Sequence, residues 1–129
     1  MGSVALSIAV AAFGAFALSF GWYMLFGARL AALSPAYALE ERPSVAVPML
    51  ELLRSLVAAA VLAVLAHFSD ARTLLGGAML GLVAWIGFPL VILGGSVLHE
   101  KYPWKLAAIH LGDWLLKLVL LGSIVAAWR

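Results

Sequence analysis

Three polar side chains stand close together in the apolar segment at the C-terminal end of the chain. His110, Asp113 and Lys117 are spaced three and four residues apart between Trp104 and Arg129. On a helix that advances about 100° per residue, they fall within about 60° of one another and form one stripe. An imidazole, a carboxylate and an ammonium can bind polar ligands or relay protons. Inside a membrane such groups are costly to bury, so they need charged partners or water.

The composition is typical of an integral membrane protein. Of the 129 residues, 66% are hydrophobic and 11% are charged, and the mean hydropathy is +1.13. A soluble domain is closer to half apolar and a quarter charged. The net charge is only +2 and no basic patch is present, which excludes a nucleic-acid-binding surface. Cysteine is absent, so disulfides, thiolate metal sites and cysteine nucleophiles are excluded.

Four long apolar segments predict an all-α membrane protein, with four transmembrane helices in an antiparallel bundle that forms a single domain over residues 1–129. The predicted spans cover approximately residues 3–26, 48–68, 74–98 and 104–128. Each is long enough to cross about 30 Å of hydrocarbon at 1.5 Å per residue. The first segment exceeds a signal-peptide core of about 7–15 residues, and no Lys or Arg precedes it. We therefore interpret it as a retained span.

The third span contains a proline and several glycines. Pro89 predicts a kink, because proline removes one helical hydrogen bond and clashes with the preceding turn. Gly77 and Gly81 form a GxxxG pair, and Gly87 and Gly94 are a heptad apart. Small residues let the backbones of membrane helices approach closely, so these four glycines are predicted to serve helix packing.

The second span carries charges that can pair with the C-terminal stripe. Glu51 and Arg54 lie one turn inside it, three residues apart on one helix face. The second and fourth spans begin on the same side of the membrane. Counted at 1.5 Å per residue, these two residues lie roughly as deep as His110 and Asp113, and Lys117 lies deeper, near the middle. We predict one intramembrane polar cluster of Glu51, Arg54, His110, Asp113 and Lys117.

Two further residues end on the same side and are candidates for the rim of this cluster, Tyr23 and His99. Ser19 precedes Tyr23 by one turn and could present its hydroxyl inward as well, whereas Trp22 is expected at the membrane interface. The cluster itself has two interpretations. It is a buried ion-pair network that fixes the helix register, or it is a pocket or half-channel that binds a polar ligand or relays protons.

The distribution of basic residues predicts the orientation. Four of them flank the spans on the side of the two larger connections, Arg29, Arg42, Lys101 and Lys105. The other side has Arg72 and Arg129. Because cytoplasmic loops carry the excess of Lys and Arg, the larger loops are expected in the cytoplasm and both termini outside.

No enzyme, cofactor or metal motif is recognisable. The chain lacks HExxH, a P-loop, a Rossmann glycine pattern and a serine elbow. His99 and His110 flank a short turn, an awkward geometry for two haem ligands facing each other from separate spans. His99, Glu100, His110 and Asp113 offer oxygen and nitrogen ligands, yet we predict no metal site, no cofactor and no catalytic residue. An enzyme is the less favoured interpretation.

The sequence resembles a membrane family known as domain of unknown function 1761. The resemblance is carried by the run from Gly81 to Trp128. The family's glycine-rich third span has a Trp-x-Gly-Phe element, matched here by Trp85, Gly87 and Phe88, and its fourth span ends in a glycine and a tryptophan, matched by Gly122 and Trp128. The end of the first span, Trp22-Tyr23 and Leu25-Phe26-Gly27, is also similar, whereas residues 36–65 show no recognised match. The resemblance implies a bacterial four-helix protein of the inner membrane and implies no activity.

The leading hypothesis is a small multi-pass membrane protein that binds or transports a small polar or ionic solute, as a homo-oligomer in the lipid bilayer. Asp113 and His110 would be its proton or ligand groups, Lys117 and Arg54 counter-charges, and Glu51 a second carboxylate. The alternative is a non-catalytic accessory or assembly subunit of a larger membrane complex. An intramembrane enzyme that acts on a lipid is a third.

Overall fold

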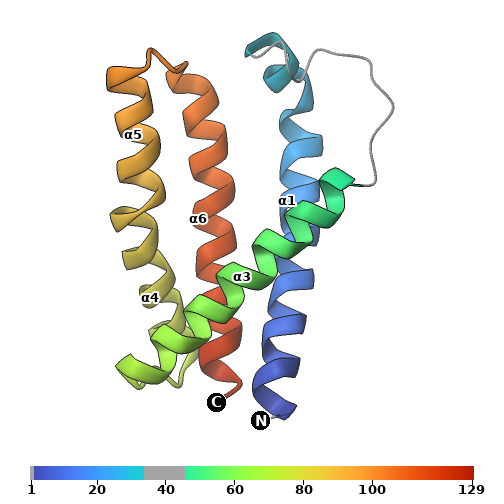
Figure 1. Ribbon diagram of the computed structural model, residues 1–129, viewed down its shortest axis with the longest axis vertical. Helices are drawn as coiled ribbons and strands as arrows, with labels where there is room; N and C mark the ends of the chain where they lie inside the picture. The colour runs from blue at the N-terminus through green and yellow to red at the C-terminus, as the bar shows by residue number, and fades with distance from the viewer. Residues whose placement is uncertain (1, 34–45) are drawn as a thin grey trace.

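The computed structural model describes residues 2–33 and 46–129, and these residues are almost entirely helical (Figure 1). The helices are α1 (Gly2–Leu33), α3 (Ala46–Ser69), α4 (Leu74–Gly87), α5 (Pro89–His99) and α6 (Trp104–Ala127). Within the described ranges there are four segments long and apolar enough to cross a membrane: α1, α3, α4 with α5, and α6. The predicted all-α architecture of four spans is therefore confirmed.

The first helix is longer than predicted. α1 continues beyond Phe26 to Leu33, because a single glycine costs a helix only about 1 kcal/mol relative to alanine and Gly27 is followed by strong helix formers. The extension contributes to packing. Leu30 is buried in a small apolar cluster with Leu106 and Ile109 of α6. The connection that follows, with Arg42, lies outside the described residues.

The kink predicted at Pro89 is present as a break between α4 and α5. Phe88 stands between the two helices with φ −119° and ψ −77°. Its N–H still donates to the carbonyl of Ala84 at 3.0 Å, and its own carbonyl accepts from Ile92 at 2.9 Å. Pro89 has no N–H for the carbonyl of Trp85, so one helical hydrogen bond is lost there.

α6 is the centre of the arrangement. It contacts α1, α3, α4 and α5, most extensively α4. Figure 1 shows α3 crossing the other helices obliquely, from a point part-way along α1 to the foot of α4. In the described residues no Cα of α3 comes within 8 Å of a Cα of α5. The bundle is therefore open on the side between these two helices.

The glycines of the third span divide into two pairs. A Cβ on Gly77 would lie 2.0 Å from the carbonyl oxygen of Gly122, and one on Gly81 2.2 Å from that of Leu118, so both permit close contact between α4 and α6. Around Gly87 and Gly94 a Cβ would meet no described atom within 4 Å. The expected packing role of this second pair is not seen among residues 2–33 and 46–129. On a helix the two lie about 80–100° away from Gly77, on a different face.

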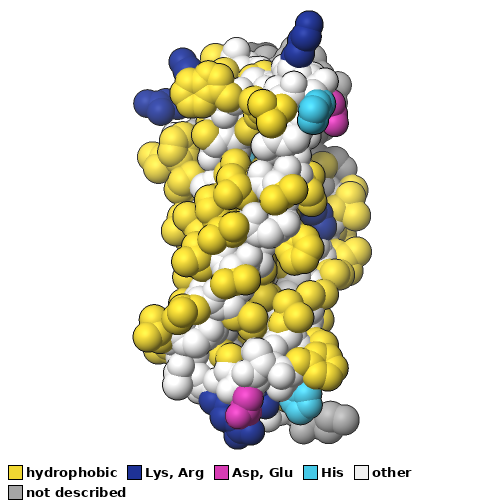
Figure 2. Space-filling view, turned by 90° about the vertical axis from the view of Figure 1, so that its left-hand side faces the viewer, with side chains coloured by type: hydrophobic (Ala, Val, Ile, Leu, Met, Phe, Trp, Pro, Cys, Tyr) yellow, Lys and Arg dark blue, Asp and Glu magenta, His cyan; other side chains and the backbone are white. Residues whose placement is uncertain are grey.

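The surface agrees with a membrane location for the bundle. In Figure 2 charged side chains gather at the two ends of the visible face, and an apolar band lies between them. A basic side chain interrupts this band near mid-height. Both termini lie at one end of the molecule (Figure 1), as an even number of spans requires.

Candidate functional site

Asp113 and Lys117 form a buried ion pair on α6. They are only 2% and 1% exposed, and Lys117 Nζ lies 3.6 Å from Asp113 Oδ2. The spacing of four residues places them on consecutive turns of one helix face. The hydroxyl of Ser19 on α1 donates to the other carboxylate oxygen, Asp113 Oδ1, at 2.6 Å. Both oxygens of this buried carboxylate therefore face a donor.

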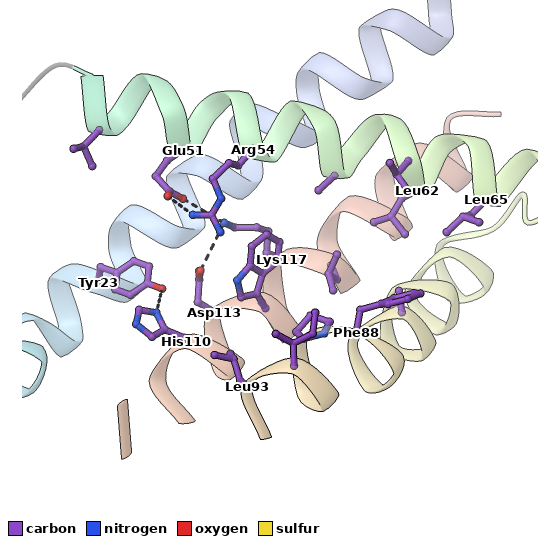
Figure 3. Close-up of a pocket in the computed structure, with 18 residues that line it drawn as sticks. Tyr23, Glu51, Arg54, Leu62, Leu65, Phe88, Leu93, His110, Asp113 and Lys117 are labelled. Carbon is purple, nitrogen blue, oxygen red and sulfur yellow. Dashed lines mark hydrogen bonds and ion pairs between the residues drawn. The ribbon is translucent and has the colours of Figure 1, made fainter. Parts of the chain in front are cut away.

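α3 supplies a second pair of charges to the same place. Arg54 Nη1 donates to Glu51 Oε1, and Glu51 Oε2 lies 3.9 Å from Lys117 Nζ (Figure 3). Lys117 thus stands between a carboxylate of its own helix and one of α3. The oblique path of α3 makes this possible, because the helix begins part-way along α1 and crosses the bundle from there (Figure 1).

His110 completes the cluster through α1. Its Nδ1 is hydrogen-bonded to the hydroxyl of Tyr23 at 2.7 Å, and the two rings are tilted at a centroid distance of 5.6 Å. Tyr23 therefore lies inside the cluster and not only at its rim. His99, the other expected rim residue, is exposed at the end of α5 and does not line the cavity described below. The reason is that the cavity is lined by the first half of α5, at Pro89, Ile92 and Leu93, whereas His99 is the last residue of that helix.

An aromatic side chain that the sequence reasoning did not single out belongs to the site. The ring centroid of Trp114 lies 4.5 Å from Lys117 Nζ and 5.3 Å from Arg54 Cζ. Cations at this distance from an indole face are stabilised by its quadrupole. The position of Trp114, next to Asp113 and three residues before Lys117, is the only sequence signal that could have indicated it.

Two indoles hold α6 in place at the level of the cluster. Trp22 Nε1 donates to the carbonyl of Ile109, and Trp85 Nε1 donates to that of Leu111, both at 2.9 Å. Trp22 was expected at the membrane interface, but its ring packs on Gly112, where a Cβ would lie 2.5 Å from the ring. These contacts from α1 and α4 fix the rotation of α6 and so the direction in which its polar stripe points.

The cluster forms one end of a cavity of about 800 Å³ between α3, α5 and α6. Figure 3 shows the polar side chains gathered at that end. The remaining walls are apolar and come from α3, from the α4–α5 break and from α6: Val47, Ala58, Val61, Leu62, Leu65, Ala84, Phe88, Pro89, Ile92, Leu93 and Leu118. The site therefore joins buried charges to a long apolar surface. In the described residues no group of three or more His, Asp or Glu side chains is placed to hold a metal ion.

The family model for "Protein of unknown function (DUF1761)" matches residues 6–126. The chain belongs to this family. The match includes residues 36–65, where no resemblance had been recognised, so Glu51 and Arg54 lie inside the DUF1761 region. No curated protein and no solved structure matches the chain.

Proposed function

We propose that this DUF1761 protein binds a small polar or ionic solute within the membrane, in the cavity headed by the cluster of Glu51, Arg54, His110, Asp113 and Lys117, and that binding serves transport of the solute. The observation that carries the proposal is the position of Lys117. Its ammonium is fully buried, lies between two carboxylates, and lines a cavity instead of a packed interface.

The polar residues divide into two roles under this proposal. Lys117 and Arg54 supply positive charge to a bound solute, while Asp113 and Glu51 balance those charges when the cavity is empty. His110 offers an imidazole that could carry a proton, and its hydrogen bond to Tyr23 orients the ring. A network that served only to fix helix register would not need a cavity beside it.

Cysteine labelling tests whether the cavity admits ions, because the chain has no cysteine of its own. Ala58 lines the cavity, whereas its neighbour Val57 is 56% exposed on α3 and does not line it. In proteoliposomes we expect a charged methanethiosulfonate reagent to modify Ala58→Cys much faster than Val57→Cys, which faces lipid. Equal, slow modification of both would mean that no ionic path reaches the cavity, and the proposal would fail.

We further propose that the protein resides in the bacterial inner membrane with both termini outside the cytoplasm. The larger loops carry more basic residues than the ends that bear the termini, in keeping with the positive-inside bias. Alkaline phosphatase fused after Arg129 is expected to be active. If the alkaline phosphatase fusion is inactive and a green fluorescent protein fused at the same position is fluorescent, the termini lie in the cytoplasm and the proposed orientation is wrong.

A second candidate function is an assembly subunit of a larger membrane complex or a homo-oligomer. One observation favours it: Gly87, Gly94 and Gly95 leave open space on α5 and at the break before it, and membrane helices pack closely at small residues. Purification in a mild detergent would then recover a stoichiometric partner or a second copy. Gly94→Leu should release that partner while Gly27→Leu, at another open glycine, should keep it. Recovery of a monomer alone would remove this candidate.

A further inference from the structure

The cavity opens sideways, between α3 and the break that separates α4 from α5. Its two long walls are α3 and the break between α4 and α5, and in the described part of the chain no Cα of α3 lies within 8 Å of a Cα of α5. Val61 on one wall and Phe88 and Ile92 on the other are more than half exposed. A ligand with an apolar portion can therefore enter from the hydrocarbon layer and lie between these walls. A fully polar solute would gain nothing from most of this lining.

At the polar end the acceptors are already occupied. Each oxygen of the two carboxylates has a positive or hydroxyl partner: Asp113 faces Ser19 and Lys117, and Glu51 faces Arg54 and Lys117. A cationic headgroup would have to displace one of these partners. The charge of the site thus gives no ready place to a cation.

The hydrogen-bond donors of Arg54 and Lys117, by contrast, are only partly engaged. Arg54 has a guanidinium with five N–H groups, of which one, on Nη1, is hydrogen-bonded within the described residues. Its side chain is 54% exposed and lies at the cavity wall beside Trp114. The contacts of Lys117 Nζ to carboxylate oxygens, 3.6 and 3.9 Å, are longer than hydrogen bonds. A planar or tetrahedral anion can bind the guanidinium fork and share the ammonium.

We propose that the ligand of this cavity is a single-chain amphiphile with an anionic headgroup, a carboxylate or a phosphate. The headgroup binds Arg54 and Lys117, and the chain lies along Val61, Leu62 and Phe88 toward the lateral opening. The size of the cavity, about 800 Å³, falls in the range of about 300–1,000 Å³ that holds one drug-sized molecule. The assignment rests on the proposed binding of a solute in this cavity, and it replaces the small polar or ionic solute with an amphiphile.

Protection of a cavity thiol from modification tests the assignment. Ala58→Cys reports on this cavity, and Ala60→Cys, which lines a separate cavity near the termini, is the matched control. The purified full chain in a neutral detergent is treated with a neutral maleimide in the presence of dodecanoate, dodecyl phosphate, acetate or dodecyltrimethylammonium. At about ten times its Kd, a bound ligand should slow the labelling of Ala58→Cys about tenfold by mass action and leave that of Ala60→Cys unchanged.

The probes separate the possible results. Protection of Ala58→Cys by dodecanoate or dodecyl phosphate, and not by acetate at equal concentration, is the expected outcome. Equal protection by acetate would uphold a small-solute site and overturn the amphiphile. Protection by dodecyltrimethylammonium to the same degree would overturn the preference for an anion. If no probe slows the labelling of Ala58→Cys, both the amphiphile and the proposed binding function fail.

Substitution of the guanidinium tests the headgroup contact. Arg54→Gln should weaken protection by dodecanoate about 10- to 100-fold, as expected for a lost charge-assisted contact. Arg54→Lys should restore part of it. Arg72→Gln, at an exposed arginine of the turn before α4, should have no effect. Unchanged protection in Arg54→Gln would place the headgroup elsewhere and overturn the assignment.

Discussion

Removal of one member of the buried pair Asp113–Lys117 should destabilise the protein more than removal of both. At 3.6 Å and an effective dielectric constant of about 20, two unit charges attract by about 4–5 kcal/mol. Breaking such a pair leaves a buried charge without compensation, which typically costs about 3–5 kcal/mol, whereas replacing both members by neutral groups costs far less.

The two single substitutions should differ from each other. Asp113→Asn leaves Lys117 with Glu51 at 3.9 Å, but that carboxylate is 35% exposed and shared with Arg54. We expect a loss near the lower end of the range, about 3 kcal/mol. Lys117→Met removes the ammonium that lies 3.6 Å from the buried Asp113 carboxylate and leaves the hydroxyl of Ser19 as its hydrogen-bond donor, so its loss should be the larger.

The free energy of unfolding is measured in mixed micelles, with circular dichroism monitoring the loss of helix as the fraction of denaturing detergent is increased. The double variant Asp113→Asn/Lys117→Met should be at least as stable as the better single variant. A control pair on the exposed turn, Asp70→Asn/Arg72→Gln, should leave the stability nearly unchanged, because exposed ion pairs are screened by solvent. If the double variant loses the sum of the two single losses, the two charges do not interact and the cluster as described is wrong.

Three other substitutions test separate parts of the structure. Gly81→Leu should separate α4 from α6 and lower the free energy of unfolding by about 1–3 kcal/mol or more, because its Cβ would lie 2.2 Å from a backbone carbonyl. Gly94→Leu, in open space, should change it little when unfolding is measured in the same micelles. Trp85→Phe removes the hydrogen bond to the carbonyl of Leu111 and should cost about 1 kcal/mol, and a thermal melt indistinguishable from that of the native chain would contradict the bond. The hydrogen bond and charge of Arg72 hold the pKa of Asp70 below its ordinary 3.8, so the small stabilisation from this pair should be present above pH 3.8 and lost as the pH falls through the lowered pKa. Asp70→Asn should abolish that acid-dependent loss of stability, and a pH profile of stability that this substitution leaves unaltered would refute the interaction.

Hydropathy was sufficient to predict the four spans, because each is a long apolar segment between polar turns. The break at Pro89 also follows from the chemistry of proline, which lacks an N–H. The candidate residues of the cluster could be named from the sequence, because residues three and four apart on a helix share a face. Charges buried at one depth in a membrane also require opposite charges nearby. Glu51 and Arg54 were thus expected at the depth of Asp113, whereas Lys117 was expected deeper, and its approach to Glu51 within 3.9 Å is seen only in the structure.

The direction of α3 was beyond such reasoning. Counting depth along a helix assumes that it runs along the membrane normal, whereas tilt is set by packing against neighbouring helices. The oblique path of α3 determines that the cavity lies between α3 and the first half of α5. The indole contacts of Trp22 and Trp85 with α6 were equally hidden, because a tryptophan near a span end is more often an interfacial residue.

The claim that an anion is bound at the guanidinium of Arg54, beside the buried pair, can be measured most directly by native mass spectrometry. The protein and its Arg54→Gln and Arg72→Gln variants would each be released from neutral-detergent micelles containing dodecanoate. The structure predicts one dodecanoate per chain in the native protein and in Arg72→Gln, and its loss in Arg54→Gln. Equal numbers of adducts in all three proteins, or none in any, would contradict the account.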